Sequence, residues 1–145
     1  MKKYLYIIFI FSFITILNAC SKSNVIDNVL FQKVLLAGTS SISNTKHIWQ
    51  YDSCKIDGIN QTLTIYQRSY KKSYTYDGYY SDTDNNLGKW EINTLNKLKE
   101  KISYQGINKI DSITYDIISI NAAQLNLSRK LENGQTVVYI FKISY

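Results

Sequence analysis

From residue 47 onward, the chain is a succession of short segments rich in β-branched and aromatic residues, separated by glycine, asparagine and aspartate. Such segments, several with apolar residues at alternate positions, are typical of β-strands. No two are separated by the roughly 10–15 helical residues that a βαβ unit needs, and the chain has no proline, so we expect an antiparallel sheet. The eight predicted strands are residues 47–51, 61–67, 69–77, 88–94, 98–104, 111–120, 124–130 and 136–144.

The order of these segments indicates a closed sheet. Asn133 and Gly134 lie between the last two, and this dipeptide is a strong signal for a tight hairpin turn. A long meander leaves two unpaired edges unless its first and last strands pair. The predicted fold is therefore all-β, a small antiparallel up-and-down β-barrel of about eight strands.

A short N-terminal helix is expected before the barrel. Ile26, Leu30 and Val34 recur at helical spacing, and Gly38 follows the last apolar residues. Asn24 can cap this helix, with Asp27 at the third position of a capping-box-like pair.

The first 19 residues have the pattern of an export signal. Lys2 and Lys3 precede an apolar run over residues 4–17, and small residues follow it. That run is shorter than the roughly 20 residues that cross a bilayer. We therefore expect residues 1–19 to be a removed signal peptide, residues 20–24 to be a tether, and residues 25–145 to form the helix and barrel domain.

Leu17-Asn18-Ala19-Cys20 resembles the lipobox of bacterial lipoproteins. The resemblance implies cleavage before Cys20 and acylation of its sulfur and amine, and two or more acyl chains give stable membrane attachment. The alternative is an ordinary secretory signal with a chance cysteine. Because Ser21 is not Asp and no acidic run follows, the resemblance favours a periplasm-facing outer membrane anchor over the cell surface.

Charge and cysteine content narrow the class of protein further. Without Lys2 and Lys3, 15 of the 17 basic residues remain against 11 acidic ones, a net charge of about +4. This mild excess, in an exported protein, does not indicate nucleic-acid binding. With Cys20 acylated, Cys54 has no partner for an intramolecular disulfide.

The order of motifs over residues 29–144 resembles the lipocalin-like domain of Bacteroidota lipoproteins. The matching segments are "KVLLAG", "KHIWQY", the pair Asp52 and Cys54, "LTIYQRSYKKSYTYD", "GKWEI", "YDIISINAAQLNLSRK" and "TVVYIFKIS". The chain departs from the pattern in a longer loop before Trp49 and in the lysine-rich residues 94–101. The resemblance implies a barrel that can hold a small molecule.

Five aromatic residues are the candidates for lining a ligand site: Tyr70, Tyr74, Tyr76, Trp49 and Trp90. Strand alternation places the three tyrosines on one face together with Lys72. Packing in the core or at the barrel rim explains such aromatics equally well. For the two tryptophans, closing one end of the barrel is the favoured interpretation.

Catalytic and metal-binding patterns are weak. His47 is the only histidine, and we interpret it as a solvent-facing strand residue. One histidine and one free cysteine cannot supply a zinc site in a monomer. We therefore expect no enzymatic activity, no cofactor and no metal.

Residues 82–93 resemble a calcium-binding EF-hand loop in part. Asp82, Asp84 and Asn86 alternate as ligands would, but Leu87 replaces the required glycine and Asn93 the bidentate glutamate. A polar turn is the favoured interpretation of this segment.

Together these features predict a membrane-anchored, non-enzymatic, lipocalin-like lipoprotein that binds a small apolar or amphipathic ligand in its barrel. The alternative is an accessory lipoprotein of the cell envelope, whose barrel is a scaffold and whose loops, such as residues 78–88, contact a protein or a glycan.

Overall fold

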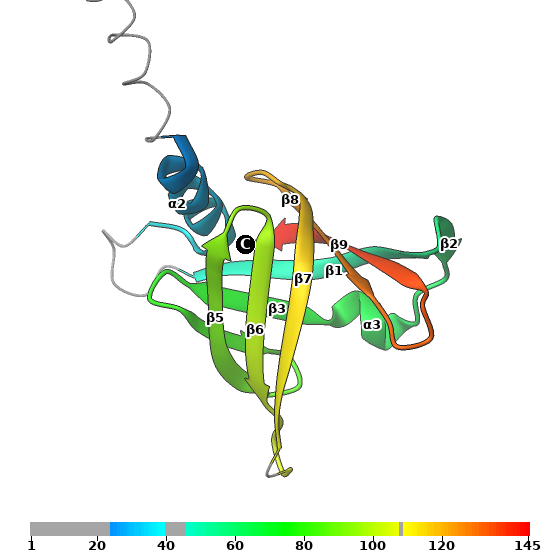
Figure 1. The fold of residues 1–145 in the computed structure, drawn as a ribbon. Coiled ribbons are helices and arrows are strands. Elements are labelled where there is room, and N and C mark those ends of the chain that lie inside the picture. The colour runs from blue at the N-terminus through cyan, green and yellow to red at the C-terminus, as the bar shows by residue number, and fades with distance from the viewer. Residues whose placement is uncertain (1–23, 40–45, 108) are drawn as a thin grey trace, which may run out of the picture.

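The computed structural model describes residues 24–39, 46–107 and 109–145 (Figure 1). The predicted signal peptide and Cys20 lie outside these residues. Among the described residues, no helix combines the length and the hydropathy needed to cross a membrane. The elements are α2 (Asn24–Ala37), β1 (Lys46–Ile56), β2 (Ile59–Gln61), α3 (Ile65–Ser69), β3 (Lys71–Thr75), β4 (Tyr79–Asp82), β5 (Leu87–Thr94), β6 (Lys97–Ser103), β7 (Ile110–Ile120), β8 (Gln124–Lys130) and β9 (Thr136–Ser144).

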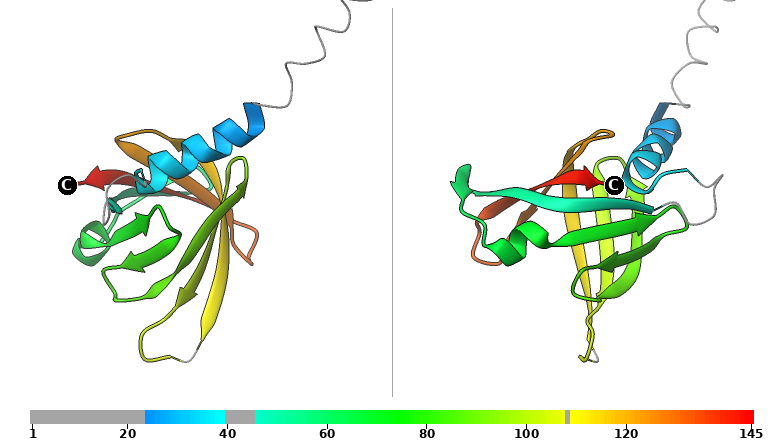
Figure 2. Two further views of the ribbon diagram at one scale, coloured as in Figure 1. Left: turned by 90° about the vertical axis from the view of Figure 1, so that its left-hand side faces the viewer. Right: turned by 180° about the vertical axis from the view of Figure 1, so that it is seen from behind.

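The strands form one antiparallel sheet that closes on itself (Figures 1 and 2). From β3 to β9 each strand pairs with the next, and β1 pairs with both β3 and β9. The predicted all-β barrel of about eight strands is therefore confirmed. β2 is an additional strand, joined to the end of β1 as a hairpin. The predicted turn at Asn133 and Gly134 joins β8 to β9, and the Leu131 amide donates to the Gln135 carbonyl at 2.8 Å.

Three of the predicted strands differ in their bounds from the structure. β1 continues past the predicted residues 47–51 to Ile56. Within residues 61–67 only Gln61 is in a strand, whereas residues 65–69 form the short helix α3. Thr64 and Gln67 form a reciprocal capping box, in which the Gln67 amide donates to the Thr64 hydroxyl and the Thr64 amide donates to the Gln67 side chain. This local pairing starts a helix where the composition favours a strand. The third predicted strand, residues 69–77, is shorter than expected, and β4 follows it after a turn at Gly78.

β1 changes partners along its length. Its first half pairs with β3 and its last residues pair with β2, while nearly the whole strand pairs with β9. A register shift between Tyr51 and Ser53 moves the inward positions by one residue. Because of this bulge, both Tyr51 and Cys54 are buried. Cys54 is a free thiol.

Helix α2 covers one end of the barrel (Figure 2). Leu36 and Ala37 are fully buried, and the Trp49 indole donates to the Leu36 carbonyl at 2.8 Å. His47 is half-buried beside this contact, with Nδ1 2.9 Å from the Leu35 carbonyl oxygen, so Nδ1 carries the proton. The interpretation of His47 as solvent-facing is therefore wrong, because the helix covers the start of β1.

The helix ends as the sequence predicts. Gly38 has a φ of 86°, and its amide donates to the Val34 carbonyl at 2.8 Å. The proposed cap by Asn24 and Asp27 lies outside the side chains that the structure describes.

The end of the barrel beneath α2 is filled with side chains. Trp49, Tyr74, Ile92, Leu98 and Leu125 are fully buried there or next to it. The Trp90 ring packs edge-on against Tyr74 at 5.9 Å, and its indole donates to the Thr75 carbonyl at 2.9 Å.

Gly88 on β5 allows the close approach of β6. A Cβ atom at this position would lie 2.1 Å from the Lys101 carbonyl oxygen, a backbone atom that cannot rotate away. This contact explains the glycine of the "GKW" motif: it lets the backbone of β6 approach β5 closely, two residues before Trp90.

We expect Gly88→Ala to lower the free energy of unfolding by about 1–3 kcal/mol, because the added methyl group forces β5 and β6 apart. Urea unfolding monitored by tryptophan fluorescence measures the change. Lys89→Ala, at the exposed neighbouring position, is the control and should stay close to wild type. Equal stability of the two variants would contradict the proposed close approach.

Candidate functional site

The half of the barrel away from α2 contains a cavity of about 340 Å³. Its walls are mainly aromatic, and charged side chains from four different strands or loops reach it. The aromatic residues are Tyr51, Tyr66, Tyr70, Tyr80, Tyr104, Tyr115, Tyr139 and Phe141, and the charged residues are Lys72, Asp82, Asp84 and Arg129.

The cavity is bordered by the place where β7 and β8 separate. Their pairing runs only from Asp116 opposite Ser128 to Ile120 opposite Leu125. Beyond this point β7 follows β6, while β8 turns away with β9 (Figure 1). Ile113 on β7 and Arg129 on β8 both line the cavity. Opposite them, α3 approaches the β4–β5 loop, where the Tyr66 hydroxyl donates to Asp84.

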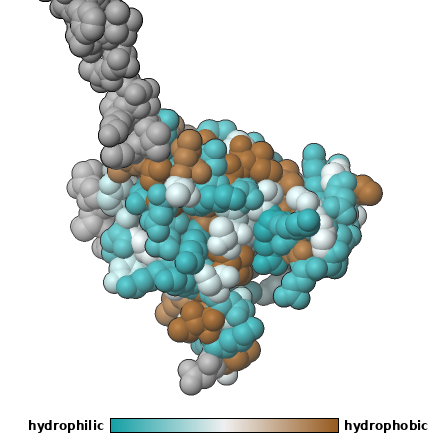
Figure 3. Space-filling view, in the orientation of Figure 1, coloured by the Kyte–Doolittle hydropathy of each residue, from teal (hydrophilic) through white to brown (hydrophobic). Residues whose placement is uncertain are grey.

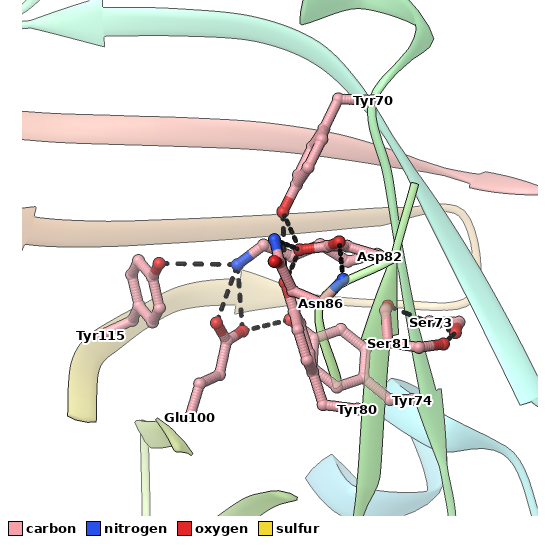
Figure 4. A network of polar contacts seen from close by, with 10 residues as sticks. Tyr70, Ser73, Tyr74, Tyr80, Ser81, Asp82, Asn86, Glu100 and Tyr115 are labelled. Atoms are coloured by element: carbon pink, nitrogen blue, oxygen red, sulfur yellow. Dashed lines mark hydrogen bonds and ion pairs between the residues drawn. The ribbon is translucent and has the colours of Figure 1, made fainter. Parts of the chain in front are cut away.

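A buried ion pair forms the floor of the cavity (Figure 4). Lys72 on β3 donates to both carboxylate oxygens of Glu100 on β6, at 2.9 and 3.1 Å. Lys72 is 6% exposed and Glu100 is fully buried. The Tyr74 hydroxyl also donates to Glu100, and Lys72 reaches the Tyr115 hydroxyl at 3.5 Å. Both charges are therefore held by further polar groups, as buried charges require.

The surroundings fix the protonation of this cluster. Burial alone would lower the pKa of Lys72, but the adjacent Glu100 carboxylate and nearby phenol groups raise it above the ordinary value. Burial and then Glu100 raise the pKa of Tyr74 well above the ordinary value. At neutral pH Lys72 is therefore an ammonium group and Tyr74 a neutral hydrogen-bond donor.

Asp82 organises the side of the cavity next to α3. Its carboxylate accepts hydrogen bonds from the Tyr70 hydroxyl at 2.9 Å and the Tyr80 hydroxyl at 2.8 Å. It also accepts from the backbone amides of Asp84 and Asn86 and from the Asn86 side chain, each at 3.0 Å. The segment that resembles a calcium loop is thus a turn whose backbone amides donate hydrogen bonds to the Asp82 carboxylate. The described residues include no group of three or more His, Cys, Asp and Glu side chains arranged to hold a metal ion.

Arg129 differs from the other charged residues of the cavity. Its Nε is buried and has no hydrogen-bond partner. The guanidinium lies 5.9 Å from the centre of the Tyr139 ring. Within the described residues, no carboxylate forms an ion pair with it.

The five candidate aromatic residues are divided between the two halves of the barrel. Tyr70 lines the cavity, and Tyr74 lies directly beneath it as a partner of Glu100. Trp49 and Trp90 are buried in the packed half and do not line the cavity. Tyr76 is half-buried and is not among the residues that line the cavity.

Sequence reasoning missed Glu100 and Arg129. In the segment "KLKEKIS", Leu98, Glu100 and Ile102 alternate and are all buried, so Glu100 occupies an inward position. Arg129 likewise follows Leu125 and Leu127 at the same spacing. A charged residue in register with apolar residues was the available signal in both strands.

Comparisons of the chain with protein-family models, with curated proteins and with solved structures found no match. The chemistry of the cavity is therefore the guide to function.

We expect Glu100→Gln to lower the free energy of unfolding by about 3–5 kcal/mol, because it leaves the Lys72 ammonium buried without a counter-ion. Urea unfolding measures the loss. The double variant Lys72→Met with Glu100→Gln should recover much of it, because no unpaired charge remains and the amide still accepts from Tyr74.

Lys101→Gln, at an exposed position on the same strand, is the control and should be close to wild type. Two outcomes would contradict the structural role of the ion pair: a Glu100→Gln variant as stable as wild type, or a double variant as unstable as the single one.

Proposed function

We propose that this chain is a membrane-anchored, lipocalin-like lipoprotein that holds one small amphipathic molecule in its barrel and catalyses no reaction. The observation that carries the proposal is the cavity of about 340 Å³ between aromatic walls and a polar floor. Barrels of about eight strands have room for one small ligand. The volume is at the lower end of the range of roughly 300–1,000 Å³ that is typical of small-molecule sites.

The lining favours an amphipathic ligand over a purely apolar one. Tyr139 and Phe141 offer aromatic surface, whereas Lys72 and Arg129 offer charge. A wholly apolar molecule would exclude water from these polar groups without replacing its hydrogen bonds, which is unfavourable. A molecule with one polar end can satisfy them and still cover the aromatic rings.

The position of α2 supports an orientation on the membrane. Asn24, the first residue of α2, follows Cys20 by four positions. The helix lies over the packed end of the barrel, and α3, at the cavity, lies away from it (Figure 2). An acylated Cys20 would thus hold the packed end towards the outer membrane. In this orientation the cavity faces the periplasm, and its ligand exchanges with the aqueous phase.

The single histidine is consistent with a binding role. His47 is engaged with the Leu35 carbonyl at the interface with α2, and it does not line the cavity. The proposal therefore assigns recognition of the ligand to the tyrosines and charged residues.

Acylation is tested by metabolic labelling with palmitate in a bacterial host. The wild-type chain should incorporate the label and fractionate with the outer membrane, because several acyl chains give stable attachment. Cys20→Ser should remain unlabelled, whereas Cys54→Ser, which removes the buried free thiol, should be labelled like wild type. Label retained in Cys20→Ser would refute the anchor.

Ligand binding is tested by mass spectrometry of small molecules extracted from the purified full-length protein. Ile113→Trp places an indole in the cavity and should abolish co-purification of a ligand, because Ile113 lines that space. The control is Ile118→Trp, on the same strand but 57% exposed, which should retain the ligand. The same molecule recovered from both variants would show that it does not occupy the cavity.

The accessory alternative has its own supporting observation. A groove of about 690 Å³ crosses the outside of β4, β5 and β6 and is lined by Tyr79, Leu87, Ile110, Lys89 and Lys101, among others. Tyr79, Leu87 and Ile110 in this groove are exposed. Figure 3 shows hydrophobic surface at the lower end of the molecule, over the β6–β7 connection. If no small molecule is recovered from the wild-type protein, this outer groove becomes the better supported site.

A further inference from the structure

The charged residues of the cavity are paired, with one exception. Lys72 and Glu100 neutralise each other at the floor. Asp82 accepts hydrogen bonds from Tyr70 and Tyr80, among other donors, and Asp84 accepts one from Tyr66. Arg129 alone among the charged residues that line this space has neither a counter-ion nor a hydrogen-bond acceptor within the described part of the chain.

The position of Arg129 is fixed by strand alternation. It follows Leu125 and Leu127, both fully buried, on the inward side of β8. Its Nε is inaccessible to solvent, so water does not replace the missing partner at that atom. The guanidinium lies over the Tyr139 ring, 5.9 Å from its centre, next to the point where β7 and β8 separate. The group therefore borders both the cavity and its open side.

An acidic group would complete this site. Leaving a buried N–H donor without an acceptor is unfavourable. A guanidinium presents its donors as a planar fork, which matches the two oxygens of a carboxylate or the oxygens of a sulfonate or phosphate. The rings of Tyr115 and Tyr139, edge to face at 6.0 Å, provide apolar surface beside it for the rest of the molecule.

We infer that the cavity selects a small free organic acid, whose anionic group binds the Arg129 guanidinium and whose apolar part lies against Tyr115 and Tyr139. This inference rests on the proposed ligand-binding function and names the class of ligand. A free acid is favoured over a phospholipid because the cavity is only about 340 Å³ and the opposite end of the barrel is packed.

The test uses two fluorescent probes of nearly the same shape on the full chain. 1-Anilinonaphthalene-8-sulfonate carries an anionic group, and N-phenyl-1-naphthylamine lacks it. Wild type should bind the sulfonate more tightly. Arg129→Gln should weaken sulfonate binding by roughly ten- to a hundredfold, the range for a lost hydrogen bond to a charged group, and should leave the neutral probe unchanged.

Two further variants separate charge from folding and from other cationic sites. Arg129→Lys keeps the charge but not the fork, and should bind the sulfonate with intermediate affinity. Lys101→Gln removes a cation from the outer groove and should bind both probes like wild type. Octanoate, a free acid, should displace the sulfonate from wild type, whereas phosphatidylglycerol vesicles should not.

The outcomes distinguish this inference from the proposed function. Equal affinity of wild type for both probes, or equal loss of both in Arg129→Gln, would overturn acid selection while leaving a cavity that binds ligands. Acid selection by Arg129 would also be overturned if Lys101→Gln, and not Arg129→Gln, reduced the affinity for the sulfonate. Displacement by vesicles but not by octanoate would replace the free acid with a lipid headgroup. Failure of wild type to bind either probe would count against the proposed function itself.

Discussion

The ion pair between Lys72 and Glu100 divides the interior of the barrel into two parts. A buried ammonium and a buried carboxylate are each unfavourable alone, so β3 and β6 have to bring them together across the barrel. On the packed side, the Tyr74 hydroxyl donates a hydrogen bond to Glu100. On the cavity side, the Tyr115 hydroxyl accepts one from Lys72. Apolar side chains fill the barrel on one side of this pair, and the cavity begins on the other. The floor of the site thus depends on one polar contact that the two strands cannot make separately.

Alternation of apolar residues was sufficient to predict the barrel, because seven of its eight strands overlap predicted segments and five of them, β5 to β9, match in their bounds to within one residue. It failed where short-range hydrogen bonds decide the backbone. The capping box of Thr64 and Gln67 forms α3 within a strand-like segment. The short strand β4 was hidden in a polar stretch, although Tyr80 and Asp82 face the interior from it. Both elements, α3 and β4, contribute residues to one side of the cavity. The sequence therefore predicted the barrel better than it predicted the open end where the cavity lies.

The site was harder to predict because its contacts depend on register. Lys72 was placed correctly on the same face as Tyr70 and Tyr74, yet its partner Glu100 is 28 residues away in the chain. Alternation alone does not say which inward residues meet across a barrel. The bulge after Tyr51 adds a further shift, since every inward position beyond it moves by one residue. A charged residue in phase with buried apolar neighbours was the one local signal, and it occurs at both Glu100 and Arg129.

The two ends of the barrel differ physically, and this difference would link the proposed anchoring to the proposed ligand binding. Trp49 donates to the Leu36 carbonyl, and Gln32 donates to the Asn96 side chain, so α2 is attached to the strands by polar contacts as well as by packing. A helix held in this way transmits the position of its first residue to the whole barrel. With an acylated Cys20 only four residues earlier, the membrane would restrain the closed end and leave the separated strands β7 and β8 in water. A ligand could then enter beside Arg129 without disturbing the packed half, so the proposed binding would not require the barrel to open at the end next to the proposed anchor.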